Sequence, residues 1–438
     1  MRIPISNTKQ SSHNIAMMFV LSFFFPILGA IFSFFTYRDK NAKNIFWLFC
    51  SFLGLIHIFH PEGTVLGEGA DGGRYALELI SMYYNIKSFD QFLHVLSSNS
   101  TFEIYQPFFT FLISRFTSNP HWLFWGFSIV YGYFYSRNIW YILDKIPGKI
   151  PKGIWILILF YILICPIWNI NGVRMWTALH IYCFGVFPYL FDNDKSKLPI
   201  AISSIFVHFS FIMPVALLSI YFLIPNRIRV LEKFLIITLV FFFVTLGIEI
   251  FSVKQIGDFL YKIAPNLFET NISGYLGSEY IDRIDQMANE KSILYKVVMY
   301  AGKYGISYLV LLCFYLFHKN ARLCIYKDNI SRIFSFGLLM YSVANILAIL
   351  PSGSRFIVLA RMFILPSIIL ILSYLGYKNT ISNLFTKIVL VLFLLVIVMQ
   401  FRIGMESYGI DLFFGNFITA IFIESNVSLF MIINSILE

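Results

Sequence analysis

The segment Ile164–Phe187 reads ICPIWNINGVRMWTALHIYCFGVF and is apolar over nearly all of its length, with Arg174 as its one charged residue. Apolar runs of about 20 residues are typical of membrane-spanning helices, whereas barrel strands alternate over about 10 residues. Of the 438 residues, 58% are hydrophobic and 13% are charged, against about 25% charged in soluble domains. The sequence therefore predicts an all-α polytopic membrane protein.

Similar apolar runs recur along the chain and indicate about 11–13 transmembrane helices, some of them broken or re-entrant. They lie at 15–36, 44–60, 102–118, 121–141, 151–168, 172–191, 199–224, 233–253, 295–318, 332–351, 355–376 and 383–402, and a further apolar piece covers 412–437. We find no internal repeat or soluble domain, so we expect a single integral membrane domain over residues 1–438. Two longer polar segments, 61–101 and 254–294, are expected to be loops on the outer face.

The charge distribution predicts how the chain is oriented. The net charge is +10, and the basic residues lie mainly in short loops between apolar runs. Basic loops favour the cytoplasmic side, so the two longer segments, which are acidic or balanced, are expected on the outer side. No basic block with interleaved aromatic residues stands apart from the membrane, and we therefore expect no nucleic-acid partner.

Counting spans between these loops gives the wrong parity in two intervals. A broken or re-entrant helix in each interval would correct the count, and the candidates are 103–116, which is short, and 198–224, which holds His208 and Pro214. Irregular backbone at membrane depth is tolerated where it is buried in protein or lines a wet cavity. The conflict therefore points to a cavity, although one basic loop on the outer side would remove it instead.

The glycine-rich stretch Gly67–Tyr75, GEGADGGRY, is predicted to be an outer loop that follows an apolar run. Glycines permit positive φ and the close approach of a ligand. Asp71 could accept a proton from a hydroxyl group, and Arg74 could bind a phosphate through two parallel hydrogen bonds. The alternative is a plain surface turn in which Asp71 and Arg74 neutralise each other.

The same polar segment is predicted to contain a short amphipathic helix. Ser88 and Gln91 have the spacing of a capping box. An apolar stripe at i, i+3, i+4 and i+7 follows, formed by Phe89, Phe92, Leu93 and Leu96. A comparable stripe over residues 281–288 predicts a second surface helix. The two helices could roof a cavity or merely cover the ends of spans.

Arg174 is the strongest functional candidate, because an arginine at the centre of a membrane helix costs about 3 kcal/mol and is usually functional. Asn169, Asn171 and Gly172 precede it and predict an irregular start to its helix. A cation there could grip a diphosphate and stabilise it as a leaving group. The alternative is a side chain that extends to lipid headgroups.

Three further polar residues stand in apolar runs. His208, with Ser210 and Pro214 beside it, is either a buried hydrogen-bonding residue or a proton-transfer group. Arg355 opens a late apolar run and is the better phosphate ligand. Arg361 lies on a different helical face, so the two arginines need not share a site, and Arg361 could be half of a buried pair.

Several short motifs follow one another in a recognisable order. They are Gly69-Ala70-Asp71 with Tyr75, Gln106-Pro107-Phe108-Phe109, Asn171-Gly172-Val173-Arg174 with Ala178, His208-Phe209-Ser210, and finally Arg355. In this order the chain resembles the EpsG family of bacterial exopolysaccharide and O-antigen (Wzy-type) polymerases. The family usually has an acid where this chain has Gln106, and Glu103 lies one turn away and could substitute.

The resemblance implies a glycosyltransferase that joins undecaprenyl-diphosphate-linked oligosaccharide repeats on the outer face of the cytoplasmic membrane of a bacterium, and a GT-C-like fold is compatible with it. Donor and acceptor would both be lipid-linked oligosaccharides, in contact with membrane lipid, with a chain-length regulator and a flippase as protein partners. The expected catalytic residues are Asp71, Glu103, Arg174 and His208. The expected substrate-binding residues are Arg74, Tyr75, Asn171, Arg355 and Arg361. Neither a metal nor another cofactor is required if arginines neutralise the diphosphate.

Other functions remain open from the sequence. A lipid-linked oligosaccharide flippase should show repeated halves and midplane charges in several spans, neither of which we find. A membrane acyltransferase needs a catalytic histidine, and His57 or His208 could serve. A ligase that moves finished glycan would share the arginine chemistry, and a scaffold in an export complex would need none of it.

Overall fold

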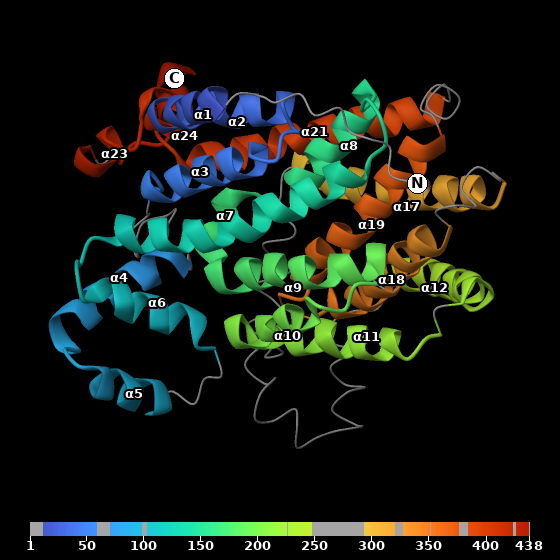
Figure 1. Cartoon of the computed structure of the whole chain (residues 1–438), viewed down its shortest axis with the longest axis horizontal. Coiled ribbons are helices and arrows are strands. Elements are labelled where there is room, and N and C mark those ends of the chain that lie inside the picture. Colours follow the sequence, from blue (N-terminus) through green and yellow to red (C-terminus); the bar gives the residue numbers. More distant parts are fainter. Residues whose placement is uncertain are drawn as a thin grey trace.

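The computed structural model describes residues 12–58, 71–98, 103–225, 227–247, 293–319, 327–350, 352–375, 384–423 and 426–437. These residues are 83% helical and contain no strand (Figure 1), which confirms the predicted all-α class. The predicted surface helix over 281–288 lies outside the described residues, as do residues 59–70, which include the start of the glycine-rich stretch.

The helices of the first half are α1 Ser12–Phe24, α2 Pro26–Phe35, α3 Ala42–Leu55, α4 Asp71–Asn85, α5 Phe89–Ser98, α6 Tyr105–Ser114, α7 Pro120–Lys145, α8 Lys152–Ile162, the 3-10 helix η1 Ile167–Gly172, and α9 Val173–Asp192. Those of the second half are α10 Leu198–Val207, the 3-10 helix η2 Phe209–Phe211, α11 Ile212–Phe222, α12 Ile228–Leu246, α17 Ile293–Lys319, α18 Lys327–Leu347, α19 Arg355–Leu375, α21 Leu384–Ser407, α22 Asp411–Phe414, α23 Thr419–Phe422 and α24 Leu429–Leu437.

Long apolar helices make this a membrane-embedded protein. Among the described residues, five segments are long and apolar enough to cross a membrane. They are Lys152–Asp192, Ile293–Lys319, Asp328–Leu347, Arg355–Tyr374 and Leu384–Ser407. Shorter apolar helices accompany them at Pro26–Phe35, Ala42–Leu55, Leu198–Val207 and Phe209–Phe222. The expected total of about 11–13 spans stays a prediction.

Small residues let the apolar helices approach closely, as is usual where lipid provides no hydrophobic drive between helices. A Cβ added to Gly54 of α3 would lie 2.1 Å from the Oγ of Ser128 in α7. A Cβ added to Gly185 of α9 would lie 2.4 Å from the backbone nitrogen of Ala201 in α10. Both helix pairs therefore depend on glycine at the crossing point.

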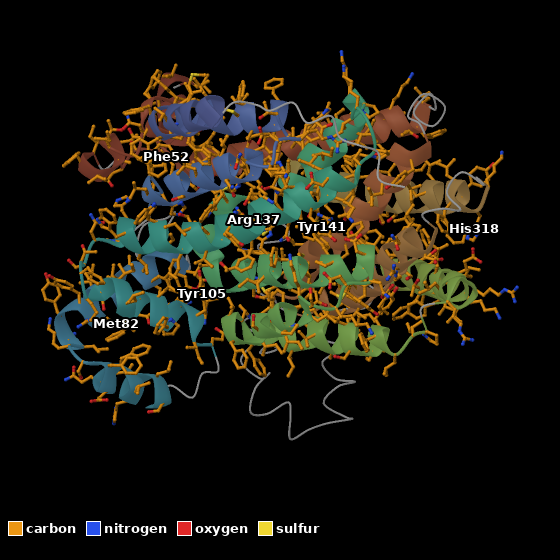
Figure 2. The ribbon with its side chains drawn as sticks, viewed as in Figure 1. Phe52, Met82, Tyr105, Arg137, Tyr141 and His318 are labelled. Atoms are coloured by element: carbon orange, nitrogen blue, oxygen red, sulfur yellow. The ribbon has the colours of Figure 1, made fainter. Side chains whose placement is uncertain are left out.

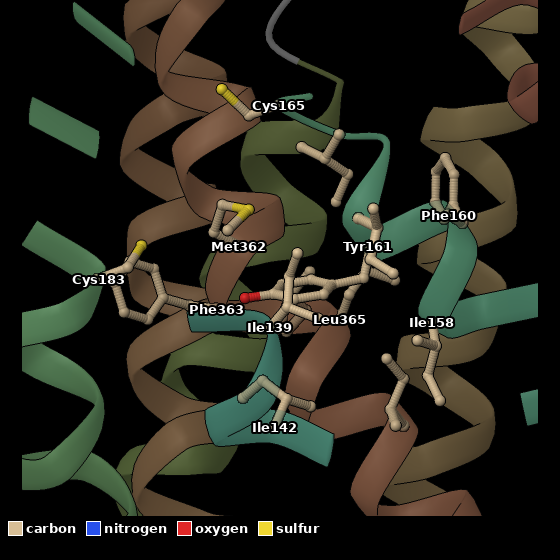
Figure 3. Close-up of a cluster of buried hydrophobic side chains, with 14 of the residues drawn as sticks. Ile139, Ile142, Ile158, Phe160, Tyr161, Cys165, Cys183, Met362, Phe363 and Leu365 are labelled. Carbon is tan, nitrogen blue, oxygen red and sulfur yellow. The ribbon is translucent and has the colours of Figure 1, made fainter. Parts of the chain in front are cut away.

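Buried side chains from α7, α8, α9 and α19 form the centre of the molecule. Figure 3 shows Ile139, Tyr161 and Phe363 pointing toward one another from three of these helices. Arg137, labelled in Figure 2, lies on α7 and donates to Asn44 Oδ1 at 2.6 Å, with its guanidinium 4.0 Å from the Tyr133 ring centroid. This charge is thus satisfied within the bundle.

One end of the bundle gathers basic residues. Arg38 donates at 2.7 Å to the carbonyl oxygens of Ile146 and Gly148. Lys145, at the end of α7, pairs with Asp192 at the end of α9. The Tyr374 hydroxyl, near the end of α19, donates to the Lys145 carbonyl at 3.1 Å. We call this the basic end, and because Arg174 starts α9, it lies at the opposite end of that helix.

Helices α10 and α11 form a hairpin whose tip is His208–Phe211. His208 has extended backbone, φ −148° and ψ 119°, between the two helices. Lys195, just before α10, lies 4.3 Å from the ring centroid of Phe222 at the end of α11, so the hairpin starts and finishes at the same end. The predicted break at His208 is confirmed, and the segment turns back at the end away from the basic residues.

Helices α4, α5 and α6 cluster at one side of the bundle (Figure 1). The capping box is confirmed by two hydrogen bonds. The Gln91 backbone N–H donates to Ser88 Oγ at 3.2 Å, and the Ser88 backbone N–H donates to Gln91 Oε1 at 3.3 Å. Phe92 of α5 stacks on Phe111 of α6 at 4.5 Å. Helix α6 has 10 residues, or about 15 Å, which is too short to cross a bilayer and agrees with the predicted break.

Candidate functional site

Arg174 is held by two residues that are distant in sequence. Helix α9 starts at Val173, after η1, and this irregular start agrees with the prediction from Asn171 and Gly172. The Nε of Arg174 donates to the Tyr75 hydroxyl at 3.1 Å, and one terminal nitrogen lies 2.5 Å from Glu103 Oε2. The protein therefore holds the guanidinium itself, which disfavours a side chain that merely extends to lipid.

Glu103 ties this arginine to the tip of the α10–α11 hairpin. Its second oxygen, Oε1, accepts the backbone N–H of Phe209 at 3.0 Å and lies 3.5 Å from His208 Nδ1. The side chains of Glu103 and Arg174 are only 13% and 29% exposed. We call Tyr75, Glu103, Arg174 and His208 the Arg174 cluster. Glu103 is already engaged on both oxygens, so its place in the cluster is to position other groups.

His208 is oriented by its neighbour Ser210. The Ser210 backbone N–H donates to His208 Nδ1 at 3.2 Å, and the Ser210 hydroxyl lies 2.9 Å from the same nitrogen. With Nδ1 as acceptor, the neutral imidazole carries its proton on Nε2. His208 in this form offers a hydrogen-bond donor, and its role as the proton acceptor is correspondingly weakened.

A small cavity lies between His208 and the start of α19. Its volume is about 190 Å³, and its lining includes Met175, His208, Ser210 and Arg355. Arg361 lies elsewhere, with its Nε 3.4 Å from the Tyr341 hydroxyl. The two arginines thus have different neighbours, and Arg355 is the one beside the cluster.

The prediction of a loop is wrong for Asp71–Tyr75, which form the first turn of α4. Asp71, Tyr75 and Glu78 recur at i, i+4 and i+7 and so share one face of the helix. Arg74 donates to Asp71 Oδ1 at 2.7 Å, with their side chains 54% and 32% exposed. The mutual neutralisation that the sequence left as an alternative is therefore present, but in a helix.

Gly72 lets α4 dock against η1. A Cβ on Gly72 would lie 2.5 Å from Asn171 Oδ1, closer than real Cβ atoms come. That same oxygen lies 2.9 Å from His57 Nε2. Asn171, predicted to bind substrate, thus joins the residues that follow α3 to η1 and the start of α4. Its observed role is to fix the position of the helix that carries Tyr75.

Glu78 is a residue of this region that sequence reasoning missed. Its Oε2 accepts a hydrogen bond from the Gln106 side chain at 2.8 Å, and Gln106 is only 4% exposed. Burial raises the pKa of the Glu78 carboxyl, and Gln106, Arg74 and Arg174 partly oppose that rise. Gln106 therefore holds an acid that comes from α4. A helical reading of the glycine-rich stretch would have found Glu78, because it continues the Asp71–Tyr75 face.

Comparisons of the chain with family models, curated proteins and solved structures gave no match. The functional argument consequently depends on the geometry of the cluster.

Proposed function

We propose that the chain is a membrane glycosyltransferase that polymerises undecaprenyl-diphosphate-linked oligosaccharide repeats into O-antigen, capsule or exopolysaccharide. The observation that carries this proposal is the Arg174 cluster, a cation fixed by Glu103 and Tyr75 in a mostly buried setting. A preorganised cation in a place of little water stabilises a developing anion far more than it would in solution. A diphosphate leaving group is such an anion.

In this proposal the two arginines bind the donor's diphosphate. Arg174 presents a planar guanidinium whose orientation is set by two partners, a geometry that suits phosphate oxygens. Arg355 and His208 line the adjacent cavity, and His208 would donate from Nε2. Together they supply two cations and one neutral donor, and no metal is needed to neutralise the leaving group.

We assign proton acceptance to Glu78. Its raised pKa makes it a stronger base than an ordinary glutamate, whereas Asp71 is paired with Arg74. The acceptor hydroxyl oxygen would bond to the anomeric carbon of the donor, and the bond from that carbon to the diphosphate would break. The hydroxyl proton passes to Glu78, and undecaprenyl diphosphate leaves with the bonding electrons.

The outer face of the bacterial cytoplasmic membrane is the proposed location of this reaction. The support is that α9 has the Arg174 cluster at its start and the basic end at its finish. Basic residues favour the cytoplasmic side, so the cluster would face outward, where the lipid-linked substrates of such polymers are joined according to the resemblance.

Deletion of the coding sequence in the parent bacterium tests the function. A strain that lacks a polymerase should display single repeat units in place of long surface chains, and the wild-type chain supplied in trans should restore them. Loss of all surface repeats would indicate a flippase, and normal chain length with missing acyl groups would indicate an acyltransferase. Either result would contradict the proposal, as would unchanged glycan.

A further inference from the structure

A second cavity, distinct from the one beside His208, lies among α2, α3, α8, η1 and α21. Its volume is about 460 Å³, within the range of about 300–1,000 Å³ typical of ligand sites. Its lining includes Ile31, Leu53, Leu163, Trp168 and Tyr408 and contains no charged side chain among the described residues. Ile31 is 50% exposed, so the cavity reaches a surface that faces lipid if α2 lies in the membrane.

Two polar atoms in this lining have no partner. The Nε1 of Trp168 and the hydroxyl of Tyr408 are buried, and neither forms a hydrogen bond within the described part of the chain. Tyr408 as a whole is only 2% exposed. An indole N–H can only donate, and a tyrosine hydroxyl donates readily. Buried donors without acceptors are destabilising, so the site suits a ligand that brings an acceptor.

Another apolar cavity lies beside this one, toward the basic end. This neighbouring cavity, of about 580 Å³, shares Ile31, Phe34, Leu159 and Ile162 with the cavity described above and includes Lys149. Trp168 and Tyr408 lie at the other extreme, because Tyr408 follows the end of α21, where Ser407 accepts the Ile58 N–H at 3.0 Å. The two adjacent cavities are mostly apolar, with the Trp168 and Tyr408 donors at one end and Lys149 toward the other.

We propose that this cavity binds an acyl chain of a membrane glycerophospholipid, with the ester carbonyl accepting from Trp168 Nε1 and Tyr408. An acyl ester is an uncharged acceptor attached directly to a hydrocarbon chain, as the lining requires. A polyprenyl diphosphate fits less well, because its chain has no acceptor for Trp168 and Tyr408. Its diphosphate would need cations, and the lining around these two donors has none, since Lys149 lies in the neighbouring cavity toward the basic end. The inference does not depend on the proposed glycosyltransferase activity.

The bound lipid would restrict the motion of η1, the segment that precedes Arg174. The Tyr408 ring packs edge-on against His57 at 5.8 Å, and His57 contacts Asn171 of η1. The proposed lipid therefore contacts η1 directly at Trp168 and also borders it through Tyr408 and His57. Lipid on this side would hold η1 in place without touching the substrate.

Photocrosslinking with the full chain tests the proposal. The protein is reconstituted in vesicles of phosphatidylethanolamine and phosphatidylglycerol that contain phosphatidylethanolamine with a diazirine in its acyl chain, or a diazirine-bearing polyprenyl phosphate. We expect the phospholipid probe to label α2, α8 and α21 residues of the cavity. Ile31→Trp, which fills the cavity, should lower this labelling at least about fivefold, and Tyr408→Phe should lower it about 2- to 12-fold, as for one hydrogen bond.

The matched control is Ile388→Trp on α21, since Ile388 is 47% exposed and does not line the cavity. It should label like wild type. Preferential labelling by the polyprenyl probe would overturn the proposal, as would equal labelling of Ile31→Trp and Ile388→Trp. Crosslinks from the cavity to residues 1–11 of the same chain, in place of lipid, would also overturn it, because the cavity would then hold a protein segment.

Discussion

Helix α9 carries an ion pair at each end, and the two pairs differ in burial and in surroundings. Arg174 pairs with Glu103, whose side chain is 13% exposed, and Tyr75 and His208 complete the cluster. At the other end Asp192 pairs with Lys145, at 43% and 31% exposure. Exposed pairs contribute little, because water and salt screen them. A charge therefore becomes a candidate site where other polar groups converge on it away from water.

Removal of the buried cation, Arg174, should have the largest effect on activity. Arg174→Ala removes the proposed diphosphate ligand and leaves Glu103 without its cation, so we expect polymer formation to fall about 10³-fold. Membranes from the deletion strain, supplied with lipid-linked repeat units, would measure it. Arg361→Ala is the control, because Arg361 lies outside the cluster. Activity of Arg174→Ala within threefold of wild type, at equal protein level, would refute the assigned role.

Neutralising Glu78 should lower the rate about 10²-fold, the lower range for a general base. Burial raises the Glu78 pKa above the ordinary value for a glutamate, so wild-type activity should rise with pH through that higher pKa as the carboxylate forms. Glu78→Gln should abolish this acidic limb of the pH–rate profile, and Asp71→Asn should keep it. The reverse pattern would move the base to Asp71.

The same pKa shift has a consequence for stability. The pKa of Glu78 is higher in the folded state than in the unfolded state, so protonated Glu78 stabilises the folded protein. This stabilisation is complete at pH values below the unfolded-state pKa and is lost as pH rises through the folded-state pKa. Wild type should therefore lose thermal stability relative to Glu78→Gln as pH rises through that window. If the melting temperatures of the two proteins change with pH in the same way, Glu78 is not buried as described.

A milder substitution tests how α4 packs against η1. Gly72→Ala places a Cβ 2.5 Å from Asn171 Oδ1. Asn171 is held by its contact with His57, so we expect α4 to shift and carry Tyr75 away from Arg174. We expect an activity loss of about tenfold. Gly72→Ala combined with Asn171→Gly gives the Cβ room, and partial recovery in the double variant would identify the clash as the cause. Equal losses in both would point to another origin.

The exposed pair should show the smallest effect. Lys145→Ala removes the pair at the basic end, and we expect activity within about twofold of wild type and little change in thermal stability. Polymer assays and melting of the purified protein would measure both. A loss as large as that of Arg174→Ala would mean that the two ends of α9 are functionally equivalent, and the contrast between them would disappear.

Several features of the candidate site were accessible from the sequence. Arg174 and His208 stand out because isolated polar residues in apolar runs are costly, and Gly172 and Pro214 mark the irregular backbone beside each. Glu78 was not accessible in this way. Its segment is polar, so one more acid carries no signal until the backbone is known to be helical from Asp71 onward.

The sequence by itself determined the membrane-embedded helical class, the break at His208 and the capped helix at Ser88, because each follows from composition or from neighbours within a few residues. The tertiary structure alone decided the partners of Arg174, since Glu103 and Tyr75 lie 71 and 99 residues away. Local propensity cannot choose between distant charges. That choice depends on which helix ends the packing brings together and how much water it leaves between them.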